Sequence, residues 1–269
     1  MRITNNDFKL GYDLFRSEVS IRHQQTPPIV LIHGFGLDRS VWHPFVSEHL
    51  SDFMVILPDM RGHGESDAPQ GPYQMDLMAD DLTELLDTLD VDQAIVCGHS
   101  MGGYVCLALA SQYPDRLAGL GLITTNADAD NEDKRAGRYA LIEEIKTYGA
   151  VAVADNLAPR LSNDPAVVKQ SHYLISRTEP AGLIGALEGM AQRPDRAALL
   201  PEINVPALVV AGEDDQITIF EDAKSMAKSL PQGQFLGLQG AGHMPMVETP
   251  AALGKGLHAL IQRVMGSFS

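Results

Sequence analysis

The sequence predicts an α/β fold in which a doubly wound, mostly parallel sheet is flanked by helices and carries an inserted helical cap. Short apolar segments without polar alternation recur along the chain, as in strands that are buried on both faces. Amphipathic segments at helical spacing separate them, and this alternation is typical of a parallel sheet with helical crossovers. One stretch, residues 126–196, contains helical patterns alone. The 269 residues therefore suit one large domain with a smaller insertion.

The predicted sheet begins with two alternating stretches in residues 3–22, which we expect to pair as antiparallel edge strands. Further strands should follow at 29–32, 53–57, 94–97, 117–124, 207–211 and 234–238, and those at 29–32 and 207–211 have the pattern of buried strands. The helices expected between and after these strands are 42–50, 76–90, 104–110, 221–230 and 250–264. Within the second of these helices, leucines recur at core spacing among acidic residues.

The insertion consists of helix-forming stretches that are separated by Gly149 and by prolines, which interrupt helices. The stretches are 134–148, 150–157, 165–176 and 180–192, and the prolines are Pro159, Pro165 and Pro180. We therefore assign residues 1–125 and 197–269 to a core domain and residues 126–196 to a helical cap, or lid.

The pattern Gly98-x-Ser100-x-Gly102 lies where an apolar, β-branched strand gives way to a helix. In that context it is typical of a nucleophile elbow, a sharp turn that exposes a serine hydroxyl at the carboxyl edge of a sheet. The glycines allow close approach of the backbone, and the helix directs unpaired N–H groups towards developing negative charge. Ser100 is therefore the candidate nucleophile. The alternative is a tight strand-to-helix turn with a solvated serine.

A serine hydroxyl needs a base to accept its proton and a carboxylate to orient that base. In this fold class both should follow later strands, in the order Ser, Asp, His. Strand 207–211 leads to Asp214 and Asp215, and strand 234–238 leads to His243, which glycines precede. Counting from the strand end favours Asp215 as the partner of His243. The alternative for His243 is a loop histidine that caps the final helix.

An oxyanion hole requires two backbone N–H groups directed at one point. The residue after the nucleophile, Met101, should supply one of them, and Phe35 in the loop after strand 29–32 should supply the other. The neighbouring His33 and His99 are expected to orient the backbone or to line the pocket. The alternative is that residues 33–36 form only a tight turn.

The formal net charge of −15 and the isoelectric point near 4.9 argue against nucleic acid and anionic membranes as partners. The first residues are polar, and no apolar run is long enough to span a bilayer, so we expect neither a signal peptide nor a membrane segment. The two cysteines, Cys97 and Cys106, flank the elbow and look like core residues rather than a disulfide. A reducing, cytoplasmic location is expected.

On these motifs the chain resembles the α/β-hydrolase superfamily over essentially its whole length. The motifs that carry the resemblance are residues 33–36, 59–66, 98–103, 212–215 and 242–243. The resemblance implies an eight-stranded core with the lid inserted after the sixth strand, and a mostly structural role for the loop 59–66. Within the superfamily the sequence is most similar to small bacterial carboxylesterases and to the 3-oxoadipate enol-lactonase-like branch.

The resemblance implies acyl transfer through an acyl-enzyme on Ser100, with no metal or organic cofactor. We expect a carboxylic ester hydrolase for small or medium acyl chains that acts on a small-molecule ester or lactone, as a monomer or a homodimer. The main alternative is an enol-lactonase or carbon–carbon bond hydrolase acting on a carboxylated catabolic intermediate. A perhydrolase and a non-catalytic ligand-binding protein are the remaining alternatives.

The walls of the pocket should come from the lid and from loops at the strand ends. The candidate substrate contacts are Trp42, Tyr139, Leu183, Leu187, Met190 and Met244, each of which could instead pack the lid onto the core. Basic lid residues could bind a substrate carboxylate, as an enol-lactone would require, or could simply be solvated. These residues are Lys134, Arg135, Arg138, Arg177 and Arg193.

Overall fold

A computed structural model describes residues 1–5, 8–16 and 26–267, and within them an eight-stranded sheet has the order β1-β2-β4-β3-β5-β6-β7-β8. The strands are β1 (Arg2–Asn5), β2 (Phe8–Phe15), β3 (Ile29–Ile32), β4 (Val55–Pro58), β5 (Ala94–His99), β6 (Leu117–Ile123), β7 (Ala207–Gly212) and β8 (Gly233–Leu238). Strand β2 pairs antiparallel with β1 and with β4, and the remaining pairs are parallel. The predicted α/β fold class is therefore confirmed.

The strands β3 to β7 are buried along their whole length, which explains their continuous apolar sequences. The fourth strand begins at Val55 rather than at the predicted residue 53, because the Phe53 N–H closes a turn on the carbonyl of Leu50. The predicted edge pair is present as β1 and β2. The part of that prediction that covers residues 6–7 and 17–22 lies outside the described residues.

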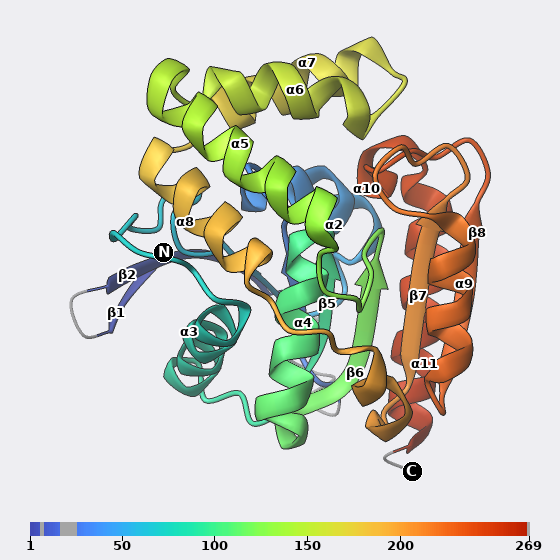
Figure 1. Ribbon diagram of the computed structural model, residues 1–269. Coiled ribbons are helices and arrows are strands. Elements are labelled where there is room, and N and C mark those ends of the chain that lie inside the picture. The colour runs from blue at the N-terminus through green and yellow to red at the C-terminus, as the bar shows by residue number, and fades with distance from the viewer. Residues whose placement is uncertain (6–7, 17–25, 268–269) are drawn as a thin grey trace.

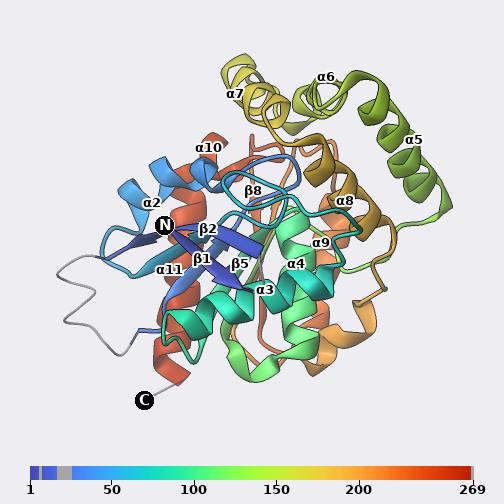
Figure 2. The same cartoon turned by 90° about the vertical axis from the view of Figure 1, so that its left-hand side faces the viewer.

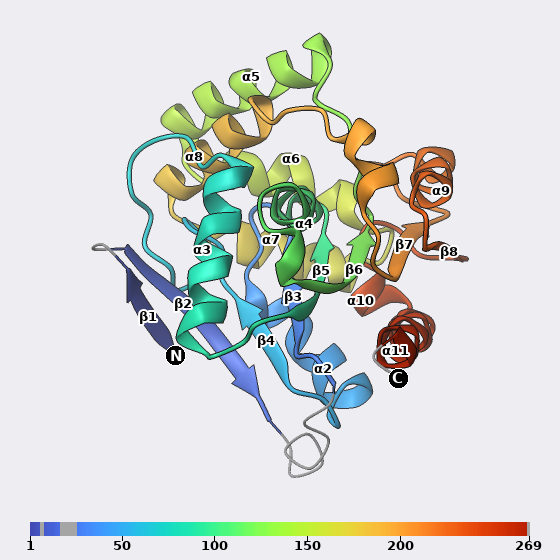
Figure 3. The same cartoon turned by 90° about the horizontal axis from the view of Figure 1, so that it is seen from below.

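Helices cover both faces of the sheet (Figures 1 and 3). One face carries α3 (Met75–Thr88), α4 (Met101–Gln112) and α9 (Phe220–Ser229), and the other carries α2 (His43–His49) and α11 (Pro250–Ser267). No helix in the described part of the chain combines the length and apolar character needed to cross a bilayer. Both cysteines are buried and free, and burial raises the pKa of the Cys97 thiol to about 12.

Four helices follow β6 and lie together above one end of the sheet (Figures 1 and 2). They are α5 (Glu132–Tyr148), α6 (Val151–Leu161), α7 (Pro165–Ser176) and α8 (Pro180–Ala191). Helix α6 continues through Pro159 to Leu161, so the predicted end at residue 157 is wrong. Proline removes a single N–H near the end of this helix. The Leu161 carbonyl accepts the N–H of His243 and the Ser162 hydroxyl donates to Glu248, and these two bonds to the core stabilise the longer form.

Several short elements carry no periodic pattern and were not predicted: η1 (Arg39–Trp42), η2 (Pro114–Arg116), η3 (Ala197–Glu202) and α10 (Pro245–Glu248). Polar contacts fix such segments locally. In η1, for example, the Asp38 carboxylate accepts the N–H of Ser40 at 2.8 Å. The loop 59–66 is fixed in the same way. Asp59 accepts the N–H groups of Arg39 and Glu65, each at 2.8 Å.

The turn from β5 into α4 brings three backbone segments together. A Cβ atom on Gly98 would overlap the carbonyl oxygen of Gly102, and a Cβ on Gly102 would lie 2.8 Å from the carbonyl oxygen of Ile32 in β3. Between them Ser100 has φ 53° and ψ −114°, a conformation that costs a non-glycine residue about 1–3 kcal/mol. The first turn of α4 thus lies directly against the ends of β3 and β5.

We expect Gly98→Ala to lower the free energy of unfolding by about 2–3 kcal/mol, because the added methyl group must displace backbone. The matched control is Gly137→Ala in α5, where an added Cβ meets nothing within 4 Å. That substitution should stabilise the protein by about 0.5–1 kcal/mol through helix propensity. Urea denaturation of both variants tests this, and equal effects would contradict the packing argument.

Candidate active site

His243 and Asp215 meet at the carboxyl edge of the sheet. The two atoms His243 Nδ1 and Asp215 Oδ2 are 2.8 Å apart, and each side chain is only 1% exposed. Asp215 also accepts the N–H of Ile217 at 2.8 Å and the hydroxyl of Thr218. Burial raises the pKa of Asp215, but the hydrogen bonds from His243, Thr218 and Ile217 outweigh it, and the pKa lies below its usual value. The neighbouring Asp214 is exposed.

The imidazole of His243 lies beside the elbow. Its ring centroid is 5.0 Å from that of His99, the residue that precedes Ser100. His99 Nε2 donates a hydrogen bond to the His243 carbonyl oxygen at 2.7 Å, and the Thr124 hydroxyl donates to the same oxygen at 3.2 Å. The structure therefore places the His243–Asp215 pair, which follows β8 and β7, against His99 at the end of β5, the residue that directly precedes Ser100.

The loop that follows β3 lies against the elbow. A Cβ atom on Gly34 would lie 3.3 Å from Ser100 Cβ. Within the part of the chain that the structure describes, neither the Phe35 N–H nor the Met101 N–H donates a hydrogen bond to a protein atom. Met101 is the first residue of α4, where N–H groups have no partner inside the helix. Both N–H groups thus lack a protein acceptor, which is a condition that an oxyanion hole has to meet.

Two buried histidines fix the backbone of this loop. His33 Nδ1 donates to the Gly34 carbonyl at 2.8 Å, and its Nε2 accepts the Met60 N–H at 3.0 Å. In a trans peptide the N–H points away from the carbonyl oxygen, so this bond orients the Phe35 N–H. His63 Nε2 accepts the Gly36 N–H at 3.1 Å. Sequence analysis did not assign His63 a role, because its partner is 27 residues away along the chain.

These ring hydrogen bonds require neutral imidazoles. Burial lowers the pKa of His63 to about 3, with a further contribution from His33. Burial and the nearby His243 lower the pKa of His99 to about 3. The pKa of His33 is lowered as well, mainly by burial.

A pocket of about 390 Å³ lies between the lid helices and the core. Its lining comes from Phe35, Ile217 and Thr218 of the core, and from Asn126 and helices α5, α6 and α8 of the lid. Leu187 is one of its lining residues. The other predicted substrate contacts do not line this pocket, and their roles remain predictions. Trp42, Leu183, Met190 and Met244 are buried, and Tyr139 is 42% exposed.

The charged groups of this pocket differ in how they are paired. Two of its lining residues, Arg138 and Asp130, form an ion pair, and Asp130 also accepts a hydrogen bond at 2.7 Å from Nη1 of Arg193, which does not line the pocket. By contrast, within the described residues the side chains of Lys134 and Arg160 make no hydrogen bond or ion pair, although both line the pocket. Arg160 was missed because it follows Pro159, beyond the predicted end of the helix.

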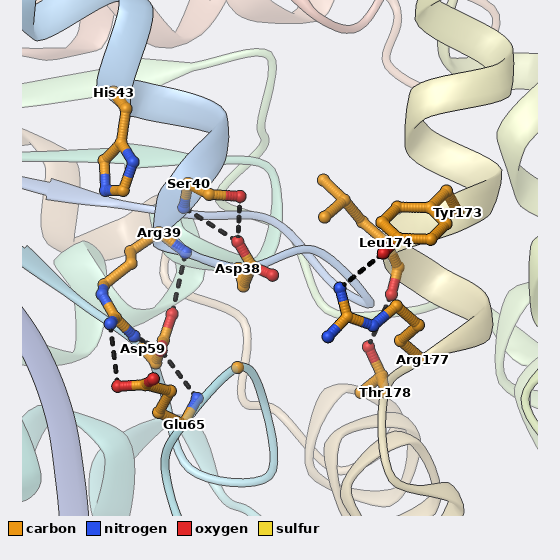
Figure 4. A pocket seen from close by; sticks show the side chains of 11 residues that line it. Asp38, Arg39, Ser40, His43, Asp59, Glu65, Tyr173, Leu174, Arg177 and Thr178 are labelled. Atoms are coloured by element: carbon orange, nitrogen blue, oxygen red, sulfur yellow. Dashed lines mark hydrogen bonds and ion pairs between the residues drawn. The ribbon is translucent and has the colours of Figure 1, made fainter.

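A second pocket of about 390 Å³ lies between α7 and the loops after β3 and β4 (Figure 4). Its guanidinium groups are engaged. Arg39 binds Glu65 and Asp59, and Arg177 donates to the Tyr173 hydroxyl at 2.9 Å. Thr178, on the lid side, donates to the carbonyl of Gly36 at 3.1 Å. This region therefore joins the lid to the loop that carries Phe35.

The neutral histidines make stability depend on pH. An unfolded histidine titrates near pH 6.5, so unfolding takes up protons below that pH. The free energy of unfolding should therefore be greatest above about pH 6.5 and fall as the pH drops towards 3, by up to about 1.4 kcal/mol per pH unit for each histidine. Urea denaturation between pH 7.5 and 4.5 should show a shallower decline for His63→Gln than for wild type. The exposed His258 gives the control, because His258→Gln should leave the slope unchanged.

Comparison with known proteins agrees with this architecture. The family described as alpha/beta hydrolase fold matches residues 27–250. A 3-oxoadipate enol-lactonase from Acinetobacter baylyi is 27% identical over 267 residues, which cover 97% of this chain and 96% of that protein. A thermophilic esterase from Thermogutta terrifontis, solved with malate bound, has a TM-score of 0.91 and 34% identity, over 98% of this chain and 99% of its own.

The crystal structure of an enol-lactonase from Burkholderia xenovorans is also similar, with a TM-score of 0.88 and 30% identity over 97% of this chain and all of that one (100%). The sheet order, the position of the lid helices after β6 and the match over residues 27–250 agree with one another. The chain belongs to the α/β-hydrolase family.

Proposed function

We propose that the protein is a serine hydrolase that cleaves carboxylic esters of small or medium acyl chain length. The observation that carries this proposal is the buried hydrogen bond of 2.8 Å between His243 and Asp215, located beside a serine that a positive φ exposes at the elbow. The two unengaged N–H groups of Phe35 and Met101 supply the remaining requirement for acyl transfer.

In the proposed reaction the hydroxyl of Ser100 attacks the ester carbonyl while His243 Nε2 accepts its proton. The Asp215 carboxylate accepts a hydrogen bond from the His243 Nδ1–H, which fixes the tautomer, and it stabilises the imidazolium. The oxyanion of the tetrahedral intermediate accepts hydrogen bonds from the N–H groups of Phe35 and Met101. His243 then protonates the leaving alcohol, and finally activates the water molecule that releases the acid from Ser100.

The volume of the lid pocket, about 390 Å³, is at the small end of the range for ligand sites and suits a small or medium acyl group. Its lining of Phe35, Leu141, Leu157 and Leu187 gives an apolar surface next to polar groups. The similarity to the Thermogutta terrifontis esterase supports an ester as substrate.

The first experiment compares the hydrolysis of p-nitrophenyl esters, from acetate to decanoate, by wild type and variants. We expect Ser100→Ala to lower kcat/KM by several powers of ten, and Asp215→Asn by about 10³–10⁴-fold because His243 loses its fixed tautomer. The adjacent Asp214→Asn is the matched control and should retain activity within about twofold, since Asp214 is exposed.

Labelling with a fluorophosphonate separates the alternatives. If wild type is labelled at Ser100 but does not hydrolyse simple esters, its nucleophile is reactive and its pocket accepts a narrower class of substrates. Wild type that neither labels nor turns over would contradict the proposal and favour a ligand-binding protein.

A second candidate function is hydrolysis of a lactone or a carbon–carbon bond in a substrate that bears a carboxylate. The observation that favours it is the pair of unpaired cations, Arg160 and Lys134, on the wall of the lid pocket. A guanidinium binds a carboxylate well because two N–H groups match its two oxygens. The similarity to enol-lactonases and the malate bound to the Thermogutta terrifontis esterase support an anionic substrate.

Matched substrates test this candidate. If it is correct, wild type should prefer the p-nitrophenyl half-ester of glutaric acid to p-nitrophenyl valerate, and Arg160→Gln should reduce that preference about tenfold. Arg177→Gln is the control, since Arg177 lies on the same lid but lines the other pocket. No preference for the charged ester in wild type, or equal effects of the two substitutions, would favour the neutral ester as substrate class.

A further inference from the structure

The backbone around His243 is held by hydrogen bonds on every side, and the proposed reaction does not use the groups that hold it. Glu248, the last residue of α10, provides two of these bonds. Its Oε2 atom accepts the N–H of Gly242 at 2.9 Å and the N–H of Met244 at 3.0 Å. The carboxylate therefore binds the residues immediately before and after the proposed base.

The lid provides a third bond and also contacts Glu248. The His243 N–H donates to the carbonyl of Leu161, the last residue of α6, at 2.9 Å. The hydroxyl of the buried Ser162 donates to Glu248 Oε1 at 2.5 Å and accepts the Asp164 N–H at 3.0 Å. One end of the lid is thus part of the support of the His243 loop.

On the opposite side, His99 and Thr124 donate to the carbonyl of His243 at 2.7 and 3.2 Å. The N–H groups of residues 242, 243 and 244 and the carbonyl of residue 243 therefore all have fixed partners. Because the backbone of residues 242–244 is fixed, the imidazole of His243 can move little relative to Asp215. Bonds from N–H groups to a carboxylate are stronger than those to a neutral acceptor, which makes Glu248 an effective anchor.

We propose that Glu248 is a positioning residue for the base, and that Ser162 makes this position depend on the lid. The inference rests on the proposed role of His243 in proton transfer. Glu248 lies outside the lining of the lid pocket, so it acts on the reaction through the loop and not through the substrate. A base displaced by about 1 Å can cost about 100-fold in rate.

Glu248→Leu removes both acceptor oxygens, and we expect kcat for the best p-nitrophenyl ester to fall about 10- to 100-fold while KM stays within about twofold. Glu248→Gln keeps one carbonyl oxygen that can accept both N–H groups, so it should retain most of the activity. Ser162→Ala should fall between wild type and Glu248→Leu, because it removes only the bond from the lid.

The pH profile of kcat/KM provides a readout that general loss of stability would not move. The charged or titratable groups that face His243 are Asp215 through Nδ1, His99 through its ring and Glu248 through the backbone. In Glu248→Leu the contact between His243 and Asp215 is looser and the carboxylate of Glu248 is absent, and both changes disfavour the protonated form of His243. The acidic limb of the profile should therefore move to lower pH in Glu248→Leu.

The matched control is Asp76→Asn. Asp76 is also a core carboxylate that binds the lid segment, through an Arg196 guanidinium at 2.5 Å, but it lies far along the chain from the base. This variant should keep kcat and the pH profile of wild type. Circular dichroism and urea denaturation accompany each variant.

Wild-type kcat and an unmoved pH profile in Glu248→Leu would overturn the inference, as would a loss confined to KM. A Glu248→Gln variant no better than Glu248→Leu would do the same. Failure of wild type to label with a fluorophosphonate is a different result, because it contradicts the proposed function and not the role of Glu248 in holding the loop.

Discussion

The close contact between the first turn of α4 and the ends of β3 and β5 is the constraint on which the site depends. Gly98 and Gly102 have no side chains, so backbone from the three elements meets without intervening atoms. The same proximity places Gly34, the residue before Phe35, next to Ser100, and within the described residues the N–H groups of Phe35 and Met101 have no protein acceptor. The strained φ of Ser100 is tolerated because the surrounding packing leaves it no alternative.

Four buried histidines surround this contact, and their partners divide them into two kinds. His33, His63 and His99 bind backbone groups, and burial keeps them neutral. His243 alone among these four has a carboxylate on its ring. The neutral rings can orient backbone over a wide pH range without competing for the proton that the proposed mechanism moves. A carboxylate partner is thus what separates the proposed base from the histidines that support it.

Much of this organisation could be predicted from the sequence. Buried strands have continuous apolar sequences, and the elbow has a local pattern, so the positions of these strands along the chain and the location of Ser100 follow from short segments. Arg160 could not be predicted, because proline in the last turn of a helix resembles a helix end. The roles of Glu248 and His63 could not be predicted either. Their partners are backbone N–H groups, and every residue except proline has one, so the sequence does not show which of them a side chain binds. Pocket contacts such as Tyr139 depend on how the lid helices rotate, which amphipathic spacing alone does not fix.

The bonds from Leu161 and Ser162 to the loop of His243 have a consequence for protein engineering. Residues of α5, α6 and α8 form much of the lining of the lid pocket, which makes the lid an attractive unit for exchange between related enzymes. In a chimera whose crossover points lie at the two chain ends of the lid, Leu161 and Ser162 would come from one parent and their partners His243 and Glu248 from the other. The hydrogen bonds between them would then depend on residues from two different proteins. A recombinant design that transfers α6 together with the segment from β8 to Glu248 would keep the donor and acceptor atoms of the same parent together. The functional module for such grafting is therefore the lid plus a distant stretch of the core.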